Sequence, residues 1–169
     1  MDERPGMSAA AAFSYSSAFV SAASSRLAAH PVLLRLERRV SYDIFVCRFE
    51  NGETVPLNMS AAHEVLDPFV VARDPATDFL LVSTADGEEA GVYFNSPTGI
   101  TFNRFEGHGI MDLLAVLLRR LDAVLVVPGG PTILQRDEDR EHLFPALRDE
   151  GSVLIARTGA EIDQAIKAS

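Results

Sequence analysis

His108 is the side chain in this sequence whose type and neighbours best suit acid–base chemistry. It lies in the tripeptide Gly107-His108-Gly109, and the carboxylates of Glu106 and Asp112 are close in sequence. Imidazole exchanges a proton near neutral pH, and a neighbouring carboxylate can orient it as a general base. Glycines on both sides are also typical of a sharp turn in which the ring packs or caps. We favour that structural interpretation.

A glycine-rich loop after an apolar run is the second candidate. Residues 124–131 read Val-Leu-Val-Val-Pro-Gly-Gly-Pro, and loops at the ends of buried strands are where open α/β folds bind ligands. The spacing matches neither the GxxxxGK[ST] nor the GxGxxG phosphate-binding pattern. Three acidic residues at 137–139 would also repel an anion from the next helix. A tight turn at Gly129 and Gly130 is therefore favoured.

The same octapeptide resembles the strand-to-loop segment of the amidotransferase-like superfamily. The resemblance covers only these eight residues. It implies a nucleophilic cysteine on a strand-to-helix elbow farther along the chain, whereas Cys47 precedes the segment and is the only cysteine. We therefore do not transfer the activity of that family to this chain.

Motifs for metal binding and nucleophilic catalysis are absent from the sequence. It contains no H-E-x-x-H, C-x-x-C, G-x-S-x-G or S-x-x-K pattern, and the remaining histidines, at 30, 63 and 142, are isolated. The acidic run 137–141 lacks the glycine and the distal glutamate of a calcium loop. We predict no catalytic residue, no metal and no cofactor.

Cys47 is predicted to be a buried, unreactive thiol, because it lies among bulky apolar residues at 44–49. A single cysteine excludes an intrachain disulfide and favours a reducing, cytoplasmic location. The alanine-rich segment 7–29 contains seven serines and is interrupted by Arg26, so we expect neither an export signal nor a membrane span. Its serines recur at helical spacing and predict an amphipathic helix whose small, weakly polar face is solvent-exposed; the alternative is that this face is the contact in a homo-oligomer.

The charge of the chain is −9 and is unevenly distributed, with +2 in residues 1–49, −8 in 50–100 and −3 in 101–169. An acidic surface repels the phosphate backbone of nucleic acids and speeds the approach of a basic protein. We therefore expect a basic protein partner and no nucleic-acid binding. The acidic residues expected to bind it are Glu50, Glu53, Asp74, Asp78, Asp86, Glu88 and Glu89.

Alternating apolar residues and turn dipeptides predict most of a sheet. The expected strands are 40–49, 53–57, 69–72, 79–84, 92–95, 100–105, 123–127 and 153–156. Asn51-Gly52 predicts a two-residue hairpin after the first strand. The three strands from 79 to 105 form an antiparallel meander.

Helices are expected at 60–66, where Ser60 is the cap, at 110–121 and after Thr158, which opens a capping box with Glu161. A further helical stretch between strands 123–127 and 153–156 makes these two strands a parallel crossover with both strands central. The chain is predicted to be one α+β (mixed α/β) domain over residues 1–169, with helices packed on the meander sheet and a C-terminal β-α-β-α crossover.

Together these features predict a non-enzymatic, protein-binding module. The single lysine beside fourteen arginines suggests a GC-rich bacterial gene. We expect an acidic protein that neutralises or escorts a basic partner, as a toxin-immunity protein or a chaperone does. The alternative is a small-ligand-binding protein or enzyme that uses loops 106–109 and 128–132, with a pocket lined by His108, Gly129 and Gly130.

Overall fold

The structure is a computed structural model that describes residues 43–105 and 107–168 of the 169-residue chain. Internal contacts group the described residues into one compact unit. The helix expected at 7–29, the start of the first strand and Glu106 lie outside the described residues. The single domain over residues 1–169 therefore stays a prediction.

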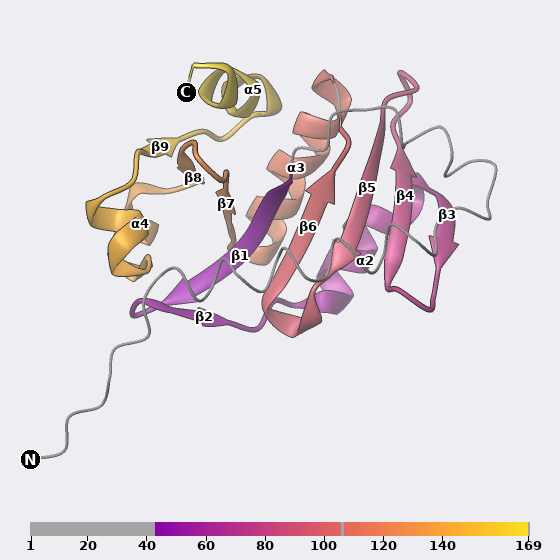
Figure 1. The fold of residues 1–169 in the computed structure, drawn as a ribbon. Helices are drawn as coiled ribbons and strands as arrows, with labels where there is room; N and C mark the ends of the chain where they lie inside the picture. Colours follow the sequence, from indigo (N-terminus) through magenta and orange to yellow (C-terminus); the bar gives the residue numbers. More distant parts are fainter. Residues whose placement is uncertain (1–42, 106, 169) are drawn as a thin grey trace, which may run out of the picture. The chain divides into compact units, whose positions relative to one another are not determined.

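The described residues form a mixed sheet of nine strands with helices packed against it, which confirms the predicted α+β class (Figure 1). The strands are β1 (Ile44–Glu50), β2 (Glu53–Val55), β3 (Val70–Asp74), β4 (Phe79–Ser83), β5 (Glu89–Phe94), β6 (Gly99–Asn103), β7 (Val124–Val126), β8 (Thr132–Leu134) and β9 (Val153–Ile155). Their order is β3-β4-β5-β6-β1-β7-β8-β9, and β2 pairs with β1. Every pairing is antiparallel except that of β8 with β9.

Helices lie between the strands in sequence, and α2 and α3 lie on one side of the sheet (Figure 1). They are α2 (Met59–Leu66), α3 (His108–Leu121), α4 (Pro145–Asp149) and α5 (Gly159–Lys167), with the 3-10 turns η3 (Asp67–Phe69), η4 (Ser96–Thr98) and η5 (Asp137–His142). Helix α3 is amphipathic. Its exposed side chains are at 112, 116, 119 and 120, and the remaining residues from 110 to 121 form a broad apolar face that packs on the sheet.

Side chains of β1 alternate between two cores because successive residues of a strand point to opposite faces. Ile44 and Val46 are fully buried in the larger core, which also contains the apolar faces of α2, α3 and α5. Phe45 and Phe49 pack on the other face, in a smaller core of Val124, Val126, Leu134 and Leu143. The central strand is therefore held from both sides.

The hairpin predicted at Asn51-Gly52 is confirmed. Glu50 pairs with Glu53, which leaves a two-residue loop, and both loop residues have positive φ, 52° at Asn51 and 84° at Gly52. This is the combination that a tight hairpin with the right-handed twist of its strands requires. The meander β4-β5-β6 is also confirmed, and β3 extends it by one strand.

The predicted cap of α2 is wrong. Asn58, not Ser60, has the extended backbone of a cap, and its Oδ1 accepts a hydrogen bond from the Ala61 amide at 3.1 Å. Ser60 already lies within the first turn of the helix. Asparagine and serine cap helices about equally well, so residue type alone does not distinguish Asn58 from Ser60.

The crossover at the end of the chain begins one strand later than expected. After β7 the chain turns back at 127–131 and forms β8, which pairs antiparallel with β7. The parallel crossover then runs from β8 through η5 and α4 to β9, and α5 follows. β9 is the edge of the sheet and Ile155 is 38% exposed, so the expectation of two central strands was wrong for β9. β8 was not predicted because it begins at Thr132, directly after the Pro-Gly-Gly-Pro turn, and continues into polar residues, whereas β7 and β9 lie in the continuous apolar runs 123–127 and 153–156.

The capping box predicted at the start of α5 is confirmed. The Thr158 hydroxyl accepts from the Glu161 amide at 3.3 Å, and the Glu161 carboxylate accepts from the amides of Thr158 and Arg157 at 3.1 and 2.7 Å. These hydrogen bonds lower the pKa of Glu161. The cap fixes the helix whose Ile162 is fully buried in the larger core.

We expect Thr158→Ala to lower the free energy of unfolding by about 1 kcal/mol, because it leaves an amide of α5 without its acceptor. Denaturant unfolding measures the loss, and Ser152→Ala, at an exposed residue just before β9, is the control. The lowered pKa of Glu161 adds stability above the usual pKa of a glutamate, and this is lost as the pH falls through the folded value. A variant as stable as the control would show that the cap contributes nothing.

Candidate functional site

The seven acidic residues expected to bind a partner lie at three turns and do not form one patch. Glu50 and Glu53 flank the β1–β2 turn, and Asp74 and Asp78 flank the β3–β4 turn, at the lower end of the sheet in Figure 1. These two turns are on strands that β5 and β6 separate, at about 4.8 Å per strand. The remaining acids, at 86, 88 and 89, lie at the β4–β5 turn at the opposite end.

Several of these carboxylates already have structural partners. Asp74 accepts hydrogen bonds from the amide of Ala76 and the hydroxyl of Thr77, both at 3.0 Å, and so closes its own turn. Asp86 accepts one from Thr84. These acids hold the turns in shape, which reduces their capacity to bind a partner.

Glu88 caps a helix that begins twenty residues later. Its two carboxylate oxygens accept hydrogen bonds from the backbone amides of His108 and Gly109, at 3.1 and 2.7 Å. A carboxylate at this position also interacts favourably with the helix dipole. Gly107 has φ of 92°, and a side chain there would overlap the Glu88 carboxylate. The glycines beside His108 therefore serve a helix cap made by Glu88, whereas the ring of His108, which was expected to pack or to cap, belongs to a side chain that is 75% exposed.

The two loops of the alternative ligand pocket lie at the same end of the sheet. His108 has a 75% exposed side chain, and its Nδ1 lies 3.7 Å from Asp163, which also binds Lys167 at 2.7 Å. Gly129 and Gly130 lie in the β7–β8 hairpin, where Gly130 donates to the carbonyl of Val127 at 3.0 Å. A hairpin turn aims no helix amide at a ligand, unlike a phosphate-binding loop. A pocket at these loops stays a prediction.

A different pair of segments forms a cleft. The β1–β2 hairpin lies against η5 and the start of α4, because the Gly52 amide donates to the His142 carbonyl at 3.0 Å. The cleft has a volume of about 320 Å³. It is lined by Arg48, Phe49, Glu50, Asn51, Asp122, Arg136, Asp139 and His142.

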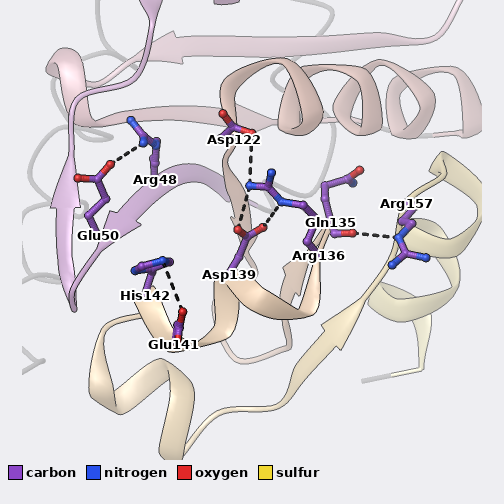
Figure 2. A network of polar contacts seen from close by, with 9 residues as sticks. All are labelled: Arg48, Glu50, Asp122, Gln135, Arg136, Asp139, Glu141, His142 and Arg157. Carbon is purple, nitrogen blue, oxygen red and sulfur yellow. Dashed lines mark hydrogen bonds and ion pairs between the residues drawn. The ribbon is translucent and has the colours of Figure 1, made fainter.

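Arg136 organises the polar network of this hairpin–η5 cleft (Figure 2). Its guanidinium donates two hydrogen bonds to Asp139, at 2.9 and 3.2 Å, and lies 3.3 Å from Asp122. The hydrogen bond and charge of Asp139, and then Asp122, raise the pKa of Arg136. Arg48 forms an ion pair with Glu50 on the opposite side. The two arginines are thus neutralised by three carboxylates, and the cleft is slightly acidic.

Exposed acidic side chains surround the cleft. Beside it lies a second hollow of about 380 Å³, lined by η5 and by Arg148 of α4. We define the hairpin–η5 surface by the seven exposed acids of the β1–β2 hairpin, η5 and the end of α4: Glu50, Glu53, Asp137, Glu138, Glu141, Asp149 and Glu150. Arg140 pairs with Asp137 and Arg148 with Asp149, which leaves the surface with a net negative charge.

Two of these seven acids, Glu50 and Glu53, are among the residues that the sequence predicts to bind a partner, and the other five are not. The run at 137–141 was noticed, but it was interpreted as the solvated start of a helix. Contacts of Gly52 join this run to the hairpin. The Gly52 amide donates to the His142 carbonyl, and a Cβ added to Gly52 would lie 3.5 Å from Cδ of Pro145. This contact joins segments about ninety residues apart, so no local pattern reveals it.

Within residues 43–105 and 107–168, no three His, Cys, Asp or Glu side chains are placed to hold a metal ion. None of the helices in this part of the chain combines the length and apolar character needed to cross a bilayer. The chain matches no known protein-family model, no curated protein and no solved structure.

Cys47 lies on β1 between β6 and β7, half-buried on the face of the smaller core. Burial raises the pKa of its thiol to about 11. The thiolate is the nucleophilic form, so this thiol is unreactive at neutral pH.

We expect Glu88→Ala to lower the free energy of unfolding by about 1–2 kcal/mol, because it removes the cap from two amides of α3. Chemical denaturation measures the change. Glu89→Ala, the neighbouring residue at the same turn, should stay within about 0.5 kcal/mol of the parent chain. Equal effects of the two substitutions would rule out the cap.

We expect the Cys47 thiol to react slowly with a small disulfide reagent at pH 7.5 in the native chain, because the high pKa leaves little thiolate. The rate should rise with pH and should rise most when denaturant unfolds the chain. The same chain in denaturant is the control. Labelling that is equally fast with and without denaturant would contradict the prediction.

Proposed function

We propose that this chain is a non-enzymatic binding module that neutralises or escorts a basic protein, in the manner of a toxin-immunity protein or a chaperone. The observation that carries the proposal is the hairpin–η5 surface, where four of the seven exposed acids, Glu50, Asp137, Glu138 and Glu141, line two hollows. We place the basic partner on this surface.

Charge complementarity supports this choice of surface. Residues 43–168 contain 21 acidic and 10 basic side chains, so the described part of the chain attracts cations over long distances. Long-range attraction raises the rate of encounter, and the local arrangement then selects the partner. The hairpin–η5 surface is concave as well as negatively charged, because it contains two hollows that a basic side chain can enter.

The alternative of a small-ligand-binding protein or enzyme has weaker support. It needs His108 to be an oriented general base, whereas this imidazole is largely exposed and its nearest carboxylate belongs to an ion pair with Lys167. We therefore propose a protein partner. A bacterial, cytoplasmic setting belongs to the same proposal and rests on the arginine-rich composition and the single cysteine.

A charge-reversal experiment tests the proposal. The tagged full chain is used to capture proteins from a lysate of the bacterium that encodes it, and the variant carries Glu53→Arg, Glu138→Arg and Glu141→Arg. We expect the parent chain to retain a basic protein that the variant loses. With the purified partner, stopped-flow mixing at low salt should show an association rate at least about tenfold lower for the variant, with a weaker dependence on salt.

A matched triple variant at other exposed acids, Glu64→Arg, Asp67→Arg and Asp78→Arg, is the control. It changes the net charge by the same amount but leaves the hairpin–η5 surface and the Glu88 cap intact, so binding should persist. Both variants should melt close to the parent chain, because exposed substitutions have small effects on stability. If the first variant retains the partner, or the control loses it, the partner does not bind the hairpin–η5 surface.

A further inference from the structure

His142 differs from the other polar residues of the hairpin–η5 cleft, because histidine changes its charge near neutral pH. It lines the cleft, and its side chain is 43% exposed. Its carbonyl accepts from the Gly52 amide, so the β1–β2 hairpin packs directly against this residue. Histidine gains a positive charge as the pH falls between about 8 and 5, whereas guanidinium groups and most carboxylates keep their charge over that range.

Charged groups from several elements line the cleft together with His142 (Figure 2). They are Arg48 and Glu50 of β1, Asp122 after α3, Arg136 before η5 and Asp139 within η5. Beside the ring, the Glu141 carboxylate lies 4.0 Å from Nε2 of His142. On the other side of η5, Arg148 of α4 lines the neighbouring hollow.

The cleft changes from acidic to neutral when His142 is protonated. While the imidazole is neutral, three carboxylates and two guanidinium groups line the cleft, which gives a net charge of −1. Protonation balances the three carboxylates with three cations. A basic ligand then loses the net attraction of the cleft and meets a like charge on one of its walls.

The hydrogen bonding of the ring adds a second effect. Within residues 43–105 and 107–168, Nδ1 of His142 is buried without a hydrogen-bond partner, and the Glu141 carboxylate is too far from Nε2 for a hydrogen bond. A neutral imidazole leaves one nitrogen unprotonated, whereas a charged ring donates from both nitrogens and needs an acceptor for each. A charged ring that turns toward Glu50, on the same cleft, gains an acceptor and occupies a carboxylate that a basic ligand would use.

We propose that His142 makes the binding of a basic ligand dependent on pH, so that the hairpin–η5 surface binds tightly near neutral pH and weakly in mild acid. The inference rests on the proposed function and describes how binding at that surface is regulated. Its two causes, the loss of net negative charge and the competition for Glu50, act in the same direction.

A deca-arginine peptide with acetylated and amidated ends is the probe, because its guanidinium groups stay charged at every pH used. Fluorescence anisotropy of the labelled peptide with the full chain at low salt measures the dissociation constant at pH 7.5 and at pH 5.5. For the parent chain we expect this constant to rise about fivefold or more in acid. His142→Gln, which is neutral at both pH values, should keep most of its affinity, and His142→Arg should bind weakly at both.

Two other histidines provide matched controls. His63 lies beside Asp67 and His108 beside Asp163, and neither lines the cleft, so His63→Gln and His108→Gln should retain the pH dependence of the parent chain. Thermal melting of each variant at both pH values shows that the chain is folded. An affinity of the parent chain that is equal at the two pH values overturns the inference, as does a parental loss of affinity in His142→Gln.

The two triple charge-reversal variants separate a failure of this inference from a failure of the proposed function. At pH 7.5 the variant at Glu53, Glu138 and Glu141 should bind the peptide more weakly than the matched control at other acids. If the two variants bind it equally, the peptide does not select the hairpin–η5 surface, and the proposed function and this inference both fail. If they differ but His142→Gln leaves the pH dependence unchanged, only the role of His142 is overturned.

Discussion

The pairing of β1 with β6 on one side and with β7 on the other holds the sheet together. The meander β3-β4-β5-β6 and the segment β7-β8-β9 are otherwise separate groups of strands, and β1 is hydrogen-bonded to both. Its side chains also join the two cores, with Ile44 and Val46 on the α3 face and Phe45 and Phe49 on the other. The continuation of β1 forms the hairpin that reaches η5, so the position of the candidate surface depends on the same strand.

Local signals in the sequence predicted the elements whose stability is decided locally. The Asn51-Gly52 turn and the Thr158 capping box were identified because their geometry requires particular residues at fixed positions. The strand β8 was missed because its short apolar segment follows a Pro-Gly-Gly-Pro turn and leads into polar residues, and the crossover was consequently assigned to β7. The candidate surface depended on a distant contact, that of Gly52 with His142, which residue spacing along the chain does not encode.

The acidic residues perform different tasks in this fold. Glu88 accepts hydrogen bonds from the first amides of α3, and Asp74 closes a turn. Both carboxylates are therefore engaged in hydrogen bonds within the chain. Glu138 and Glu141, which follow β8, are exposed beside a hollow. Charge counted along the chain therefore does not show which carboxylates are free to meet a partner, because a carboxylate that accepts an internal hydrogen bond loses part of that interaction if it binds elsewhere.

The central place of β1 also governs the kinetics of folding. Its partners β6 and β7 follow it by roughly fifty to eighty residues, so their contacts close long loops and raise the relative contact order of the chain. The hairpins of the meander close short loops and form first on this basis. Until β1 inserts, β6 and β7 each present an unpaired edge, and such edges are open to pairing with other chains. The step that completes the sheet is therefore also the step that removes its largest exposure to aggregation.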